Sequence, residues 1–101
     1  MAIADRPSAA QWSHDQQLLN RLADQALNDE GLTVCCRLIM RYENTGPATS
    51  ALARQAQDQL EAWGLDRRKA FFNCRKLWAS GYRPALEDTA TGSGADVNAA
   101  A

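Results

Sequence analysis

The sequence predicts an all-α protein: a compact, small four-helix domain with short connections and disordered tails. Apolar residues recur at helical spacing in four successive stretches of the 101-residue chain, and no stretch alternates as a strand would. Three glycines, Gly31, Gly64 and Gly81, each lie four residues after an apolar residue and directly before another. This pattern is typical of a helix closed by a left-handed glycine. The length fits one domain.

The first helix is expected over about residues 14–30. Ser13 and Gln16 form a capping box at its start, and leucines and alanines follow on one face until Gly31. Residues 1–12 contain Pro7 and no helical pattern, so they are expected to form a flexible N-terminal tail. The domain itself is therefore predicted over residues 13–84.

The second helix is expected from Thr33, a suitable N-cap, to about Asn44. Apolar side chains cover nearly its whole circumference, which indicates a central helix enclosed by its neighbours or by a second copy of the chain. The sequence therefore leaves open whether the protein forms a homodimer. Arg37 and Arg41 form the one polar strip of this helix.

These two arginines, with Tyr42 beside them, are predicted either to pair with a carboxylate or to form a secondary interface. The internal alternative is favoured, and its candidate partners are Glu43, Asp58 and Glu61.

The third helix is expected over about residues 47–63, with Pro47 in its first turn, where a missing N–H costs nothing. The fourth is expected over about residues 67–80, with Asp66 as its N-cap. After Pro84 the composition turns to small and acidic residues without periodicity. Residues 85–101 are therefore predicted to be a disordered C-terminal tail.

Charge is distributed unevenly along the chain, although its formal net value is only −1. Residues 67–84 carry six basic and no acidic side chains, whereas residues 1–66 carry five basic and nine acidic ones. A helical projection places Phe72 on the outer side of the fourth helix, among the cations. The predicted partner-binding residues are Arg67, Arg68, Lys69, Phe72, Asn73, Arg75 and Lys76.

Residues 60–82 also resemble the helix-turn-helix of winged-helix transcription regulators. The resemblance rests on Leu60, the Gly64-Leu65 turn, Asp66 opening the next helix, and Gly81-Tyr82 closing it. It implies that Arg67, Arg68, Lys69, Asn73 and Lys76 read DNA. In that family a two-stranded wing follows, whereas here Pro84 is followed by an acidic tail.

Other function classes find little support in the sequence. His14, Cys35, Cys36 and Cys74 have no spacing typical of zinc ligands, and no nucleophile is tied to His14 by a motif, so no metal, no cofactor and no enzymatic activity are predicted. The cysteines are interpreted as packing residues, with any redox role left open. No apolar run is long enough to span a membrane and no signal peptide is recognisable, which predicts a cytoplasmic protein.

The sequence thus predicts a small non-enzymatic interaction or regulatory protein that presents the basic and aromatic face of its fourth helix to an acidic protein partner. Binding of DNA or RNA through the third and fourth helices, without a wing, is the alternative.

Overall fold

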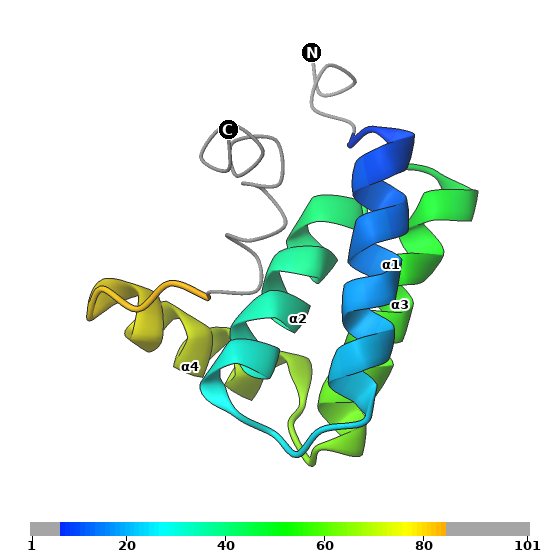
Figure 1. The fold of residues 1–101 in the computed structure, drawn as a ribbon. Coiled ribbons are helices and arrows are strands. Elements are labelled where there is room, and N and C mark those ends of the chain that lie inside the picture. Colours follow the sequence, from blue (N-terminus) through cyan, green and yellow to red (C-terminus); the bar gives the residue numbers. More distant parts are fainter. Residues whose placement is uncertain (1–6, 85–101) are drawn as a thin grey trace, which may run out of the picture.

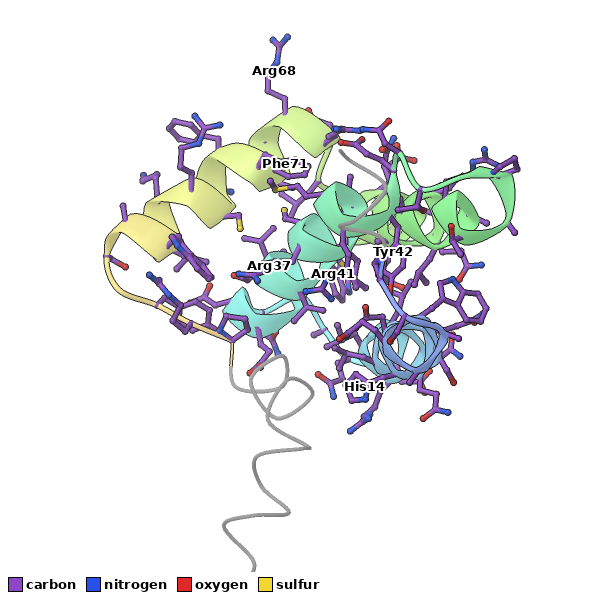
Figure 2. The ribbon with its side chains drawn as sticks, turned by 90° about the horizontal axis from the view of Figure 1, so that it is seen from above. His14, Arg37, Arg41, Tyr42, Arg68 and Phe71 are labelled. Atoms are coloured by element: carbon purple, nitrogen blue, oxygen red, sulfur yellow. The ribbon has the colours of Figure 1, made fainter. Side chains whose placement is uncertain are left out.

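The fold is all-α, as predicted. The computed structural model describes residues 7–84, and the parts of the predicted tails at residues 1–6 and 85–101 lie outside them. The four helices are α1 (Ala9–Ala23), α2 (Asp29–Tyr42), α3 (Pro47–Ala62) and α4 (Arg67–Ala79). In both views α2 lies between α1 and α4, and α4 packs against α2 and α3 (Figures 1 and 2).

The predicted bounds of α1 are wrong at both ends. The helix begins at Ala9 because the Ser8 hydroxyl acts as its N-cap, accepting a hydrogen bond of 3.0 Å from the Gln11 N–H. Ser13 lies inside the helix, and Trp12, assigned to the flexible tail, packs against the core. The helix ends at Ala23, seven residues earlier than predicted.

The start of α2 explains this early end. Asn28, and not Thr33, is its N-cap: the Asn28 side chain accepts a hydrogen bond of 2.7 Å from the Gly31 N–H. Asp29 and Glu30 follow in the first turn, where acidic side chains are favoured by the helix dipole. The acidic residues expected to end the first helix therefore begin the second, and Thr33 is buried within it.

Gly31 does not close a helix, because it lies in the first turn of α2 and has no positive φ. A Cβ built at this position would lie 2.7 Å from Cη2 of Trp63. Glycine is needed here for the close approach of the Trp63 ring, rather than for a left-handed turn.

The other two glycine ends are confirmed. Gly64 and Gly81 have φ values of 89° and 98°. The Leu65 N–H donates to the Leu60 carbonyl at 2.9 Å, and the Tyr82 N–H donates to the Leu77 carbonyl at 3.0 Å. These are the hydrogen bonds of a Schellman motif, and they fix the ends of α3 and α4.

The core is centred on α2, as predicted, with leucines of α1 and α3 packed around it. α4 contributes only Ala70 to the fully buried set, while Phe71, Cys74 and Leu77 pack against the edge of the core. Among the described residues, no helix combines the length and apolar character required to cross a membrane.

Candidate functional site

Phe72 lies on the outside of α4, as the helical projection predicts. Its side chain is 58 % exposed, and the Lys76 ammonium lies 5.4 Å from the centroid of its ring. Arg68, Lys69 and Arg75 are also exposed, and within residues 7–84 they form no ion pair. The exposed side of α4 therefore combines a large apolar ring with accessible cations.

Phe72 forms one wall of a shallow hollow on α4, which we call the α4 hollow. Its lining residues are Arg67, Arg68, Phe71, Phe72 and Arg75. The positions i, i+1, i+4, i+5 and i+8 bring these side chains together along one side of the helix. Figure 2 shows Arg68 extending away from the molecule, whereas Phe71 lies on the side of α4 that faces α2.

Arg67 is the most constrained member of the hollow. Its guanidinium donates a hydrogen bond of 2.8 Å to the Glu43 carboxylate at the end of α2. The same guanidinium lies 5.3 Å from the centroid of the Phe71 ring. Arg67 therefore orients Phe71 and holds the beginning of α4 against α2.

The remaining predicted residues do not share this hollow. Asn73 is half-buried and, together with Lys76, lines a separate depression beside Leu27, Leu32 and Leu77. Lys69 lines neither the α4 hollow nor this depression. The seven residues predicted as one surface are thus divided between two sides of α4, and the larger group lies around Phe72.

A second and larger concavity, the α2–α4 groove, adjoins the α4 hollow and shares Arg67, Phe71 and Arg75 with it. It has a volume of about 820 Å³. The other lining residues are Cys36, Arg37, Met40, Arg41, Glu43, Cys74 and Trp78. Four arginines and one glutamate line the groove, so it is strongly basic, and the 68 % exposed Met40 gives it an apolar rim.

At one end of this groove, two arginine guanidinium groups lie over the Trp78 ring. Arg37 lies 4.8 Å and Arg83 3.6 Å from the centroid of its ring. The Arg83 side chain also donates hydrogen bonds to the carbonyls of Trp78 and Tyr82, at 3.1 Å and 2.6 Å. These contacts fix Arg83 at the C-terminal end of α4, where a cation complements the helix dipole.

Two thiols meet between α2 and α4, in the lining of the groove. The side chain of Cys36 is hydrogen-bonded to Cys74, and this contact, with burial, raises the pKa of the Cys36 thiol far above its ordinary value. Cys35 differs, because burial alone raises its pKa to about 12. No disulfide joins any of the three cysteines in the structure.

Of the two alternatives predicted for Arg37, Arg41 and Tyr42, the favoured internal ion pair is confirmed for Arg41, although its partner differs, and Tyr42 does not belong to an exposed interface. Tyr42 is fully buried, and its hydroxyl donates a hydrogen bond of 2.7 Å to Asp15 of α1. Arg41 pairs with the same carboxylate at 2.9 Å, rather than with the three candidates predicted. Burial and the hydrogen bond to Asp15 both raise the pKa of Tyr42. Tyr42 is thus a core residue, and Arg41 joins α2 to α1, whereas Arg37 lies over the Trp78 ring of α4.

Sequence analysis missed Asp15, Phe71 and Met40. Asp15 lies three, four and seven residues before Leu18, Leu19 and Leu22, which is the spacing of one helix face, so its burial was detectable. Phe71 has the helical spacing of a core residue on α4, but it is only partly covered. No local signal distinguishes the exposed Met40 from its buried neighbours.

His14 is half-buried on α1, and its Nε2 atom is buried without a hydrogen-bond partner. Within residues 7–84, no three histidine, cysteine or carboxylate side chains gather as metal ligands would.

Comparison with known proteins gives one assignment. No curated protein and no solved structure matches the chain. The sequence pattern of a family described as "Protein of unknown function (DUF3288)" matches residues 8–95, which include all four helices and both concavities. The chain therefore belongs to the DUF3288 family.

Proposed function

We propose that this protein is a non-enzymatic interaction protein of the cytoplasm that binds an acidic segment of a partner protein on α4. The α4 hollow forms the centre of the contact and Phe72 is its anchor. The observation that carries the proposal is the 58 % exposure of Phe72 among side chains that are mostly cationic. Aromatic anchors and arginines are the residue types that dominate binding energy at protein interfaces.

Charge complementarity supports an acidic partner. Arg68 and Arg75 border the hollow without an ion pair to any described residue, and Lys76 lies over the edge of the Phe72 ring. Carboxylates of a partner would approach these cations while an apolar side chain packs on Phe72. The adjoining groove extends the same basic character toward α2.

A protein is favoured over nucleic acid because the beginning of α4 is poorly arranged for reading bases. The Arg67 guanidinium is held by Glu43, and Asn73 is half-buried on a different side of the helix. Asp66, which caps α4 through a 2.7 Å hydrogen bond from the Lys69 N–H, places a negative charge where a phosphate would bind. Two of the five residues that the helix-turn-helix resemblance implies are therefore already engaged or turned away.

The proposal is tested by capture from a lysate of the native host. The tagged wild-type chain is compared with Phe72→Ala and with Leu27→Ala, in the presence of nuclease. Leu27 is an exposed apolar residue that lines neither the α4 hollow nor the α2–α4 groove. We expect an acidic protein to be retained by the wild type and by Leu27→Ala and lost with Phe72→Ala, while circular dichroism of all three stays the same. Equal retention by Phe72→Ala would show that the anchor is misplaced.

A second candidate, binding of DNA or RNA, is supported by the α3–α4 corner. The two helices are joined through residues 63–66, and the Schellman hydrogen bond of Leu65 fixes the connection. Binding through four cations would weaken steeply with salt, by roughly the 0.9 power of salt concentration for each phosphate neutralised. No binding of random duplex at about 50 mM salt would exclude this candidate.

A further inference from the structure

We propose that Cys36 and Cys74 are an oxidation site that forms a disulfide between α2 and α4, with an anionic low-molecular-weight disulfide such as oxidised glutathione as the oxidant. This inference does not depend on the protein partner proposed above. It rests on the placement of the two thiols and on the chemistry of the groove that both of them line.

The two thiols are already in contact across the helix interface. Cys36 lies in α2 and Cys74 in α4, and their side chains are hydrogen-bonded to each other. The two helices pack directly against one another here. A disulfide requires Cα atoms within about 7 Å, and two thiols that interact across directly packed helices and line one groove are placed where a disulfide can form.

The groove gives an oxidant access to one member of the pair. Cys36 is 1 % exposed, whereas Cys74 is only partly buried. Arg67 and Arg75 line the same groove, and their positive charge attracts an incoming anion. Cys74 is therefore the thiol that an external disulfide meets first.

The reaction balances as two successive thiol–disulfide exchanges. Cys74 loses its proton to water and its sulfur attacks one sulfur of the glutathione disulfide, whose S–S bond breaks and releases the first glutathione as a thiol after it takes up a proton. Cys36 then loses its proton and attacks the Cys74 sulfur, which releases the second glutathione in the same way. The two protein thiols are oxidised to one disulfide, and the oxidant is reduced to two thiols.

Cys35 provides an internal control. It is adjacent to Cys36 in sequence, but successive residues of a helix point about 100° apart, and Cys35 is fully buried and does not line the groove. A reaction that follows this geometry leaves Cys35 reduced, whereas a reaction governed by proximity in sequence would involve it.

The disulfide would link the middle of α4 to the middle of α2. In the reduced protein α4 has only Ala70 fully buried, so its position depends on half-buried contacts and on the Arg67–Glu43 ion pair. The bond would close a loop of about 40 residues, which we expect to raise the melting temperature by roughly 15–30 °C.

The test uses the whole chain in its folded state, incubated with oxidised glutathione, quenched in acid and examined by intact mass and peptide mapping. We expect the loss of two hydrogen atoms, a Cys36–Cys74 cross-link, and one remaining thiol at Cys35. Cys35→Ser should behave as the wild type does, and Cys74→Ser should form no intramolecular disulfide.

Three results would overturn the proposal. The first is a glutathione adduct that persists on Cys74, and the second is a disulfide between Cys35 and Cys36. The third is that Cys36 and Cys74 of the folded chain stay reduced under conditions that oxidise the chain unfolded in urea. Because Phe72→Ala leaves both thiols in place, its oxidation should match that of the wild type whatever happens to partner capture.

Discussion

Asp15 is the residue at which the polar side chains of α1 and α2 converge. It is 1 % exposed and accepts hydrogen bonds from Gln11 at 3.0 Å, Arg41 at 2.9 Å and Tyr42 at 2.7 Å. A buried carboxylate is tolerated when its oxygens are satisfied in this way. The cluster joins α1 to the central helix and gives their contact a single register.

Asp15→Ala should therefore destabilise the protein by about 3–5 kcal/mol, because it leaves the Tyr42 hydroxyl buried without its acceptor and removes the partly buried ion pair between Asp15 and Arg41. The free energy of unfolding in urea measures this loss. Glu43→Ala is the matched control, since it removes the exposed Arg67–Glu43 pair and should cost less than about 1 kcal/mol. Similar losses in the two variants would contradict the account of the buried cluster.

Single residues were predicted with uneven success, for a physical reason. Phe72 is exposed as predicted because its position in the helical projection is separated from the apolar stripe of α4. Tyr42 was misassigned because a buried phenol needs a polar partner, and that partner, Asp15, lies 27 residues away in sequence. Helical spacing predicts the direction of a side chain but not what it meets there.

At the scale of the elements, glycine has two different roles in this chain. Gly64 and Gly81 adopt positive φ at helix ends, whereas Gly31 provides space for the Trp63 ring inside the first turn of α2. Trp63 is held in place because its indole N–H donates a hydrogen bond of 3.1 Å to the Gln25 carbonyl. The end of α3 is thereby packed against the connection between α1 and α2.

Gly31→Ala should destabilise the protein by about 1 kcal/mol, although alanine is the better helix former. The added Cβ would overlap the six-membered ring of Trp63, which is too constrained to move away freely. Urea unfolding measures the effect. In a Trp63→Phe background this overlap is absent, so the same substitution should be neutral or stabilising; an equal loss there would contradict the packing role.

The number and type of the helices could be predicted. The starts and ends marked by Pro47, Gly64, Asp66 and Gly81 all agree with the prediction to within a residue or two, because each has a local hydrogen-bonding or steric cause. The boundaries of α1 and the start of α2 could not be predicted in this way, because the sequence offers two possible N-cap residues for each of these helices. Ser8 and Asn28 cap the helices in place of Ser13 and Thr33. Trp12 and Trp63 pack near the caps that are used, and such tertiary contacts cannot be recognised from the local sequence.

At the scale of the whole molecule, α4 stands apart from the rest of the fold. α1, α2 and α3 share most of the buried core, and α4 crosses the open side of α2 (Figure 1). The basic segment of the chain therefore lies on the least enclosed helix. This arrangement leaves the α4 hollow and the α2–α4 groove accessible together.

The protein should lose stability above about pH 9. The pKa of Cys35 is raised to about 12, and the pKa values of Cys36, Tyr42 and Tyr82 are also raised, chiefly by burial or by hydrogen bonding. These groups ionise in the unfolded chain near their ordinary values of 9.0 and 10.0 but keep their protons in the folded one. Their contribution is complete below pH 9 and falls as the pH rises toward the folded values.

Urea unfolding with a reductant at pH 7, 9 and 10.5 measures this loss. We expect little change between pH 7 and 9 and a clear decrease by pH 10.5. A stability that is constant or increases over the upper interval would contradict the assigned burial of these groups.

The most direct test of the central claim is the affinity of the captured partner for wild-type protein and for Phe72→Ala, measured by titration of the purified components. Loss of an anchor worth about 2 kcal/mol corresponds to binding weakened by about 30-fold. We predict at least that decrease for Phe72→Ala and less than about threefold for Leu27→Ala. Equal affinities for Phe72→Ala and the wild type would contradict the claim that α4 presents Phe72 to a partner.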